Sequence, residues 1–496
     1  MPLINHRSFL KLVLLGMLPV ASAATVKIEI ADEKGVPVAV RIRLRDRQGA
    51  LHPPKATGSI MAHPRFPELG VVVKGATDID VPPAAAGIEL DRGTEYLPVT
   101  LAVEGPSVRR VRLKRWIDMN RQGWWSADLH AHRRPDEMPL LMDAADLNFA
   151  PAITKWNQNS NLETWPDAPM IQLSASRSYS VDNAEDERQW GAALFFGLKT
   201  PIPLYNARAE WPLPTTTWQD ARKRGAFIDQ EKIIWWAAPV MAALVPPDTI
   251  GVANNHFLEE GMLDNEAWGR PRDRARYPGH RGFANYIFDL YYSYLSAGFR
   301  IAASAGAANG VLRSPLGYSR SYVHLTNGFS PKKLLEAQKE GRNFVTNGPM
   351  LFVTVNRQLP GAVLAAATRK ANVEFDAVSR TELETVEVIL DGAVVRSFQP
   401  RGNASRIKAR AVLDVSDGSW ITVRCWERNA KTVRFAHTSP VYVGPKARQD
   451  APARARLRDW IDEYMERVGK LPPEALTAAQ KTEWLALCRQ ARDFYR

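Results

Sequence analysis

Two histidines one residue apart are the side chains in this sequence best placed to do chemistry. His130 and His132 lie in "GWWSADLHAH", directly after an apolar run typical of a strand. In a strand, residues i and i+2 point to the same face, so both imidazoles can reach one metal ion. Asp128 shares that face and is a candidate catalytic residue, either as a further ligand or as a carboxylate that orients a histidine.

A metal centre needs further ligands, and three other segments offer them. His256 in "GVANNHF" follows a predicted strand and is the first candidate for a third ligand, with a hydrogen-bonded loop histidine as the alternative. The run "AEDERQW" supplies Asp186 and Glu187, which either complete a mixed imidazole and carboxylate site or belong to a solvated turn. Asp229 ends the predicted strand "AFIDQ" and is a candidate of the same kind.

The segment from residue 123 to 350 alternates between two patterns. Short apolar runs such as "FAPAIT" and "TIGVANN" are followed by stretches long enough for helices, such as "ANYIFDLYYSYLSAG". This alternation predicts a parallel α/β sheet or a β/α barrel. Chemistry in such folds gathers at the carboxyl ends of the strands, where the histidine-bearing segments would lie.

The flanking regions have a different periodicity. Residues 24–122 and 351–445 alternate with period two, which predicts a β-sandwich domain on each side of the barrel. The first contains a Pro-rich, poorly patterned stretch at 51–67 with no catalytic pattern. The second has an Asp-Gly hairpin signal at 391–392. Residues 446–496 predict helices whose apolar stripes pack on the rest of the protein.

Residues 1–23 have the form of a secretory signal peptide. A short basic start precedes an apolar run, and small residues at Ala21 and Ala23 form an A-x-A cleavage site. We therefore expect a secreted or periplasmic protein. No later segment is apolar enough over the length that a membrane span requires.

Composition limits the remaining classes of function. The 496 residues are 45% hydrophobic, enough for several packed domains. The formal net charge of +12 suits an anionic partner such as a cell-surface polymer, but the basic residues are scattered among acids, which argues against nucleic acid. Cys425 and Cys488 lie on apolar patterns and are interpreted as core residues. The sequence indicates no oligomeric state.

Four blocks of the sequence together resemble a known family. They are "GWWSADLHAH", "GFRIAASAGAANGVLRSPLGYSRSYVHL", "GRNFVTNGPML" and "RFAHTSPVYV". The chain resembles the CehA/McbA-type metallohydrolases, a branch of the PHP (polymerase and histidinol phosphatase) superfamily. The resemblance implies a distorted seven-stranded β/α barrel that holds up to three divalent cations and hydrolyses phosphoesters or, in this branch, carbamate or ester bonds.

The chain departs from the family's pattern at three metal motifs. A Thr-Asp-His motif is replaced by Thr154, Lys155 and Trp156, a His-Pro pair is missing from "IIWWAAP", and "SAGAANG" lacks the terminal aspartate and histidine. We therefore expect about one divalent ion per chain, zinc, manganese or iron, if any. Lys155 is a candidate catalytic residue that could supply the positive charge of a missing ion; a surface lysine is the alternative.

Two functions follow from these observations. The first is a secreted, metal-dependent hydrolase of an ester-type bond in a small-molecule or surface-polymer substrate. The alternative is a barrel that has lost catalysis and binds a glycan or another ligand. Tryptophans near the predicted strand ends suit both, since indole rings line sugar and aromatic-ester clefts as well as apolar cores.

Overall fold

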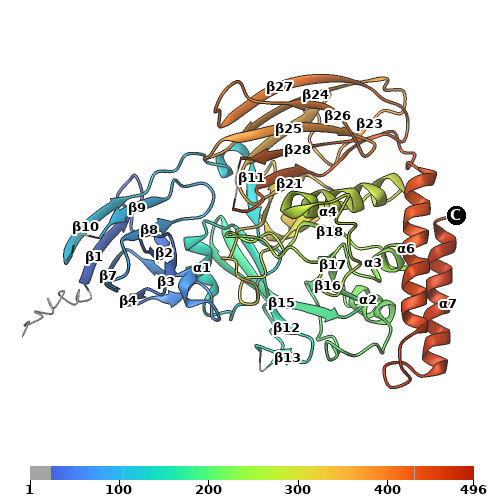
Figure 1. Ribbon diagram of the computed structural model, residues 1–496, viewed down its shortest axis with the longest axis horizontal. Helices are drawn as coiled ribbons and strands as arrows, with labels where there is room; N and C mark the ends of the chain where they lie inside the picture. The colour runs from blue at the N-terminus through green and yellow to red at the C-terminus, as the bar shows by residue number, and fades with distance from the viewer. Residues whose placement is uncertain (1–23, 104, 163, 429–430) are drawn as a thin grey trace, which may run out of the picture.

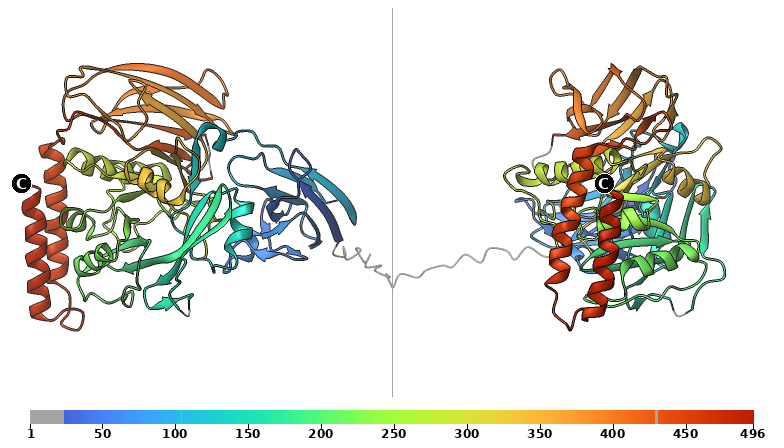
Figure 2. Two further views of the ribbon diagram at one scale, coloured as in Figure 1. Left: turned by 180° about the vertical axis from the view of Figure 1, so that it is seen from behind. Right: turned by 90° about the vertical axis from the view of Figure 1, so that its right-hand side faces the viewer.

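The computed structural model describes residues 24–496 except 104, 163 and 429–430, so the predicted signal peptide lies outside the described residues. The protein is a mixed α/β structure in which strands predominate, with seven α-helices among the described residues. Sheets from the N-terminal part lie at one end of the molecule and the two C-terminal helices at the other (Figure 1). The strands and helices of the middle of the chain lie between them, beneath the sheets of residues 350–443 (Figures 1 and 2).

The N-terminal part consists of two sheets that share one core. β10, β1, β7 and β4 form the first sheet, and β5, β6, β2, β8 and β9, with β3 at the edge, form the second. Alternate residues such as Ile28, Ile42 and Leu90 are buried between them, as period-two patterning requires. The strands are β1 (Ala24–Ala31), β2 (Ala39–Arg45), β3 (Leu51–His52), β4 (Lys55–Ala56), β5 (Ile60–Met61), β6 (Val71–Lys74), β7 (Ala76–Val81), β8 (Gly87–Asp91), β9 (Val99–Ala102) and β10 (Ser107–Arg112).

The central strands follow one another in space from β11 to β19. β11, β12 and β15 are parallel, β15, β16 and β17 are antiparallel, and β17, β18 and β19 are parallel again. The strands are β11 (Trp124–Ala127), β12 (Phe149–Trp156), β13 (Asn159–Ser160), β14 (Met170–Ser174), β15 (Arg177–Arg188), β16 (Gly191–Phe196), β17 (Phe227–Gln230), β18 (Thr249–Ala253), β19 (Ala302–Ala305), β20 (Arg320–His324) and β21 (Asn343–Thr346).

The segment directly after β11 contacts both ends of this strand series. The backbone N–H of Leu129 donates to the carbonyl of Ala305 at the end of β19, at 3.1 Å. Ala131 forms bridges to Ala152 in β12 and to Asn309 after β19. The residues that carry the two histidines are therefore held between β12 and the loop that follows β19.

Helices cover the central strands and bury large aromatic residues. They are α1 (Met138–Ala144), α2 (Pro214–Lys223), α3 (Ala238–Leu244), α4 (Gly279–Ser296) and α5 (Pro331–Lys339), followed by the C-terminal α6 (Ala451–Gly469) and α7 (Ala478–Phe494). α6 and α7 run side by side along one end of the molecule, next to α3 (Figure 1). Their apolar stripes, including Trp460 and Trp484, belong to the central core, and the Tyr495 hydroxyl donates to the carbonyl of Pro239 at 2.8 Å. Within the described ranges, no helix has the length and apolarity to cross a membrane.

Residues 350–443 add two further layers of sheet over the central part. β22, β24 and β27 form a three-stranded antiparallel sheet, and its core is shared with β25 and β28. Asp391 and Gly392 have φ values of 55° and 92° and connect β25 to β26, as expected for an Asp-Gly hairpin turn. The strands are β22 (Met350–Val355), β23 (Val363–Leu364), β24 (Lys370–Val378), β25 (Leu383–Leu390), β26 (Ala393–Phe398), β27 (Arg406–Asp414), β28 (Trp420–Glu427), β29 (Phe435–Thr438) and β30 (Val441–Val443).

The two cysteines are both buried and free. Cys425 lies in β28 and Cys488 in α7, and each belongs to a hydrophobic core. Burial raises the pKa of Cys488 to about 12, so its thiol stays protonated and unreactive at neutral pH. Both residues act as small apolar side chains.

Candidate metal centre

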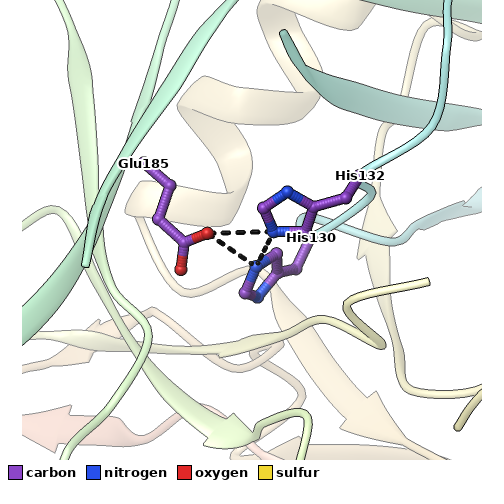
Figure 3. Close-up of side chains that lie close together, drawn as sticks. All are labelled: His130, His132 and Glu185. Carbon is purple, nitrogen blue, oxygen red and sulfur yellow. Dashed lines mark hydrogen bonds and ion pairs between the residues drawn. The ribbon is translucent and has the colours of Figure 1, made fainter. Parts of the chain in front are cut away.

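Three side chains from two separate segments meet at one point. His130 and His132 follow β11, and Glu185 lies on β15 (Figure 3). Nε2 of His130 lies 2.9 Å from Nε2 of His132, and an oxygen of Glu185 lies 2.9 Å from His132 and 3.4 Å from His130. The three residues form a buried group that could hold a metal ion.

The spacing and the chemistry of these atoms fit a divalent cation. Ligand atoms in a tetrahedral zinc site with bonds of about 2.0–2.1 Å lie about 3.3 Å apart, close to the three separations here. The buried carboxylate of Glu185 faces only the two imidazoles, and no other donor among the described residues reaches either oxygen. Because a buried carboxylate needs more than two such contacts to satisfy its lone pairs, an ion at this point would supply the missing partner.

Electrostatics tie the three side chains together. Burial alone would lower the pKa of His130, but the negative charges of Glu185 and Glu231 outweigh it and raise the pKa to about 10. Burial lowers the pKa of His132, which the charge of Glu185 only partly offsets. Burial acts to raise the pKa of Glu185, and the positive imidazoles reverse this and hold it well below its usual range. The cluster therefore favours an ionised carboxylate facing positive charge.

The backbone around the histidines is fixed by Asp128. One oxygen of Asp128 accepts the backbone N–H groups of His130 and Ala307, at 3.1 and 3.0 Å, and the other accepts that of Gly317 at 2.6 Å. The side chain is fully buried, and burial raises its pKa to about 6. Asp128 thus joins the segment after β11 to both ends of the loop between β19 and β20, and all its hydrogen bonds among the described residues are from backbone amides.

Glycine is needed where the loop after β19 passes the histidines. A Cβ atom at Gly306 would lie 2.4 Å from the Cβ of His130, and one at Gly310 would lie 2.1 Å from the carbonyl oxygen of His132. Gly310 also has a φ of 103°, which L side chains rarely adopt. The sequence "SAGAANG" therefore acts as a close-fitting wall behind the two imidazoles.

A second layer of charge lies behind His130. Nδ1 of His130 lies 3.5 Å from an oxygen of Glu231, a residue directly after β17. A carboxylate on the far nitrogen of a ligating histidine orients the ring and increases its basicity. The other oxygen of Glu231 forms an ion pair with Lys232, whose side chain is also buried. The chain therefore supplies a buried series of charged groups, from Lys232 through Glu231 to His130 and Glu185.

His256 does not belong to the group of three. Its Nδ1 is 3.1 Å from the carbonyl oxygen of Leu263, and its ring stacks on Phe283 with the centroids 5.3 Å apart. Burial, then the positive charge of Lys232, lower the pKa of His256 to about 4. The residue occupies the position of a hydrogen-bonded loop histidine, and Glu185 supplies the third atom of the group that could hold a metal ion.

Lys155 lies on β12 with a half-buried side chain. Burial and the positive charge of Arg224 lower its pKa. Within the described part of the chain, it forms no ion pair with the acids of the cluster. The buried ammonium beside the cluster belongs to Lys232, which pairs with Glu231.

The acids of "AEDERQW" lie within β15, so they are not a solvated turn. Glu187 shares a face with Glu185 and accepts a hydrogen bond from the indole of Trp156 at 3.0 Å. Burial and the charge of Glu185 raise the pKa of Glu187 to about 7. Asp186 points to the other face and forms a two-fold ion pair with Arg188, with both N–O distances 2.9 Å.

Asp229 lies at the end of β17 but is satisfied by neighbours. It accepts hydrogen bonds from the hydroxyls of Thr249 and Ser304, at 2.8 and 2.6 Å. Burial raises its pKa to about 6. Its place is therefore in the polar packing beneath the cluster.

The cluster opens on a cavity of 320 Å³ through His132. Trp156 forms part of the wall, with its ring centroid 4.9 Å from that of His132. Arg65 comes from the Pro-rich N-terminal stretch, which shows no catalytic pattern in the sequence. The cavity is lined by Arg65, His132, Ile153, Thr154, Trp156, Asn159, Asn161, Gly310 and Val311.

Comparisons with known proteins give little information. No family model matches the chain, and no curated protein matches it. A search of solved structures matches a crystal structure of an engineered protein with 18% sequence identity, over 19% of this chain and 20% of that chain, and with a TM-score of 0.14. An overlap of this size carries no argument about fold or function.

Proposed function

We propose that this protein is an exported hydrolase that uses one divalent metal ion to cleave an ester-type bond. The observation that carries the proposal is the convergence of His130, His132 and Glu185, whose buried carboxylate has no partner among the described residues apart from the two imidazoles. Two imidazoles and one carboxylate are the ligand set of many hydrolytic zinc sites and also suit manganese or iron. A cation bound there would polarise the scissile group and lower the pKa of a water molecule.

The residues around the cavity would bind and orient the substrate. Trp156 offers a ring face beside His132, suited to a sugar or an aromatic ester. Arg65 supplies positive charge at the rim, and Asn159 and Asn161 supply amide donors and acceptors. This combination favours a phosphoester, carboxylester or carbamate whose polar group faces the cluster and whose ring packs on Trp156.

The PHP-like barrel remains part of this proposal. Support comes from the strand series β11 to β19, whose two ends both contact the segment 129–131. The groups at the centre follow or end strands of this series, as expected for chemistry at the carboxyl ends of β/α strands. Export is proposed from residues 1–23, and N-terminal sequencing of the mature protein that began at Met1 would contradict it.

Metal analysis of the purified protein tests the function directly. We expect about one zinc, manganese or iron ion per chain, and hydrolysis of at least one member of a panel of phosphoesters, carboxylesters and carbamates. His132→Ala and Glu185→Gln should each abolish both bound metal and turnover, because three ligands leave no spare. His256→Gln is the matched control and should keep the metal, since its imidazole is engaged with Leu263.

The alternative function has a distinct outcome. A glycan- or ligand-binding protein would show no turnover, and His132→Ala would leave its ligand affinity almost unchanged because Trp156 and the amides carry the binding. Wild-type protein that binds no zinc, manganese or iron would exclude the proposed hydrolase.

A further inference from the structure

Lys232 is a lysine whose side chain is buried in the protein. Its side chain is 4% exposed and lies directly after β17, on the same side as the histidine cluster. The ammonium forms an ion pair with Glu231 and lies 5.5 Å from the ring of Trp235. A buried ammonium is retained only where fixed negative charge surrounds it.

That negative charge comes from the same acids that surround the metal ligands. The charges of Glu231, then Glu187 and Glu185, act on the Lys232 ammonium and raise its pKa despite its burial. Glu231 is also the acid that faces Nδ1 of His130 at 3.5 Å, and it accepts the backbone N–H of Asn255 at 3.2 Å. The lysine and the metal ligands therefore share one pool of carboxylates.

The formal charges of this pool indicate how many ions it can hold. With all three carboxylates ionised, as a bound cation favours, the buried Glu185 and Glu231 and the half-buried Glu187 contribute −3, and Lys232 contributes +1, which leaves −2. One divalent cation balances that charge. Without the lysine, the three acids and one divalent cation would keep a net charge of −1. Glu231 would then be free to bind a second cation.

We propose that Lys232 is a built-in cation that takes the place of a second metal ion beside Glu231 and so limits the centre to one ion per chain. The inference rests on the metal site of the proposed function. Lys232 is a positioning residue in this scheme: it holds Glu231 against His130 and does not touch substrate.

Replacing the lysine by an uncharged side chain of similar length tests this. Metal titration by calorimetry and elemental analysis of dialysed protein should give one ion for wild type. Lys232→Met should bind two ions, or bind the first about tenfold more tightly or better, because the site then lacks one positive charge. Lys232→Arg retains the charge and should bind one ion.

Lys155→Met is the matched control. Lys155 is also a lysine near the site, but its side chain is half-buried and unpaired with the cluster acids, so we expect one ion with unchanged affinity. Lys232→Met protein that folds only with metal present still tests the proposal. Two bound ions support it, and one ion of unchanged affinity contradicts it. The double variant Glu231→Gln/Lys232→Met restores the formal charge of −2 and should bind one ion, more weakly than wild type because the carboxylate that faces Nδ1 of His130 is lost.

The results that would contradict the proposed function differ from those that would contradict the role of Lys232. Wild-type protein without any bound ion would remove the proposed function itself. One ion in wild type and one ion of equal affinity in Lys232→Met would leave the hydrolase in place and overturn the role of Lys232. The inference is also overturned if Lys155→Met changes the stoichiometry as Lys232→Met does.

Discussion

At the scale of single residues, the hydrogen-bond partners of each side chain in the site determine which role it can have. Asp128 and Asp229 are buried acids close to the histidines, yet each is satisfied by backbone or hydroxyl donors. Glu185 lacks such donors, and this difference makes it the candidate metal ligand among these acids. The hydrogen-bond partners of a buried acid thus distinguish a structural role from a metal-binding one better than the type of residue does.

His437 gives a prediction at this scale that is independent of the metal. Its Nδ1 donates to the carbonyl of Thr438 and its Nε2 accepts from the hydroxyl of Tyr292, each at 2.8 Å. Burial, then the charge of Arg424, lower its pKa to about 3. The unfolded chain, with a histidine pKa of about 6.5, binds this proton first as the pH falls.

The stabilising contribution of neutral His437 is therefore complete above about pH 6.5 and is lost as the pH falls toward 3. Between pH 7 and pH 5 the loss is about 2 kcal/mol of unfolding free energy. Urea unfolding of wild type and His437→Gln at both pH values measures it: the variant should be less stable at pH 7 but lose about 2 kcal/mol less on acidification. Equal losses in the two proteins would contradict the assignment.

At the scale of elements, the loop after β19 controls the position of the histidines. A methyl group at Gly306 would overlap the Cβ of His130, at 2.4 Å, so Gly306→Ala must displace the ring. We expect metal affinity to fall by about tenfold or more, as for other changes that misplace a ligand. Calorimetric titration measures the affinity.

Gly191→Ala is the control for this change. Gly191 has ordinary φ and no atom within 4 Å of the added methyl group, so metal affinity and stability should be unchanged. Gly306→Ala protein that is fully folded and binds metal as wild type does would show that the loop can move away from His130.

The elements also show how far the sequence predicts this site. His130 and His132 could be found because i and i+2 on a strand end share a face, whatever the rest of the fold. Glu185 could not, since β15 buries polar residues such as Ser178 and Asn183 and has no apolar alternation to reveal a strand. Without the strand, nothing in "AEDER" indicates which acids face the site.

The presence or absence of a regular apolar pattern also explains which strands and helices the sequence predicts. Strands with apolar runs, such as β12 and β18, are predicted close to their observed bounds, α4 is predicted over most of its length, and the C-terminal helices are predicted as a region without individual bounds. The short helix α3 lies in an apolar stretch without a helical period, and Glu231 and Lys232 lie just past a strand end, where periodicity stops giving information. The roles of Glu231 and Lys232 are determined by contacts with segments that are distant in the sequence.

At the scale of the whole molecule, charged side chains join the N-terminal sheets to the central part. Arg41 on β2 forms a buried two-fold ion pair with Glu259, which follows β18, and Arg43 contacts the same acid at 3.1 Å. Burial acts to raise the pKa of Glu259, but the two arginines reverse this and hold it well below its usual range.

Glu259→Gln should therefore destabilise the protein by about 3 kcal/mol, because the buried guanidinium of Arg41 loses its two-fold partner and keeps Asp91 at 3.3 Å. Denaturant unfolding measures the change. The double variant Arg41→Met/Glu259→Met removes the unpaired charge and should recover part of that stability. A single variant as stable as wild type would mean that this contact contributes little to holding the N-terminal sheets in place.

The contact of the segment at 62–63 with the loop at 309–310 also sets when the centre can form. The carbonyl of Ala62 accepts from the side chain of Asn309, and His63 accepts from the backbone of Gly310, each across 247 positions of sequence. Contacts so distant along the chain form late in folding. For an exported chain that folds after translocation, the metal would be acquired outside the cytoplasm, so the ion supply there would decide which metal the protein carries.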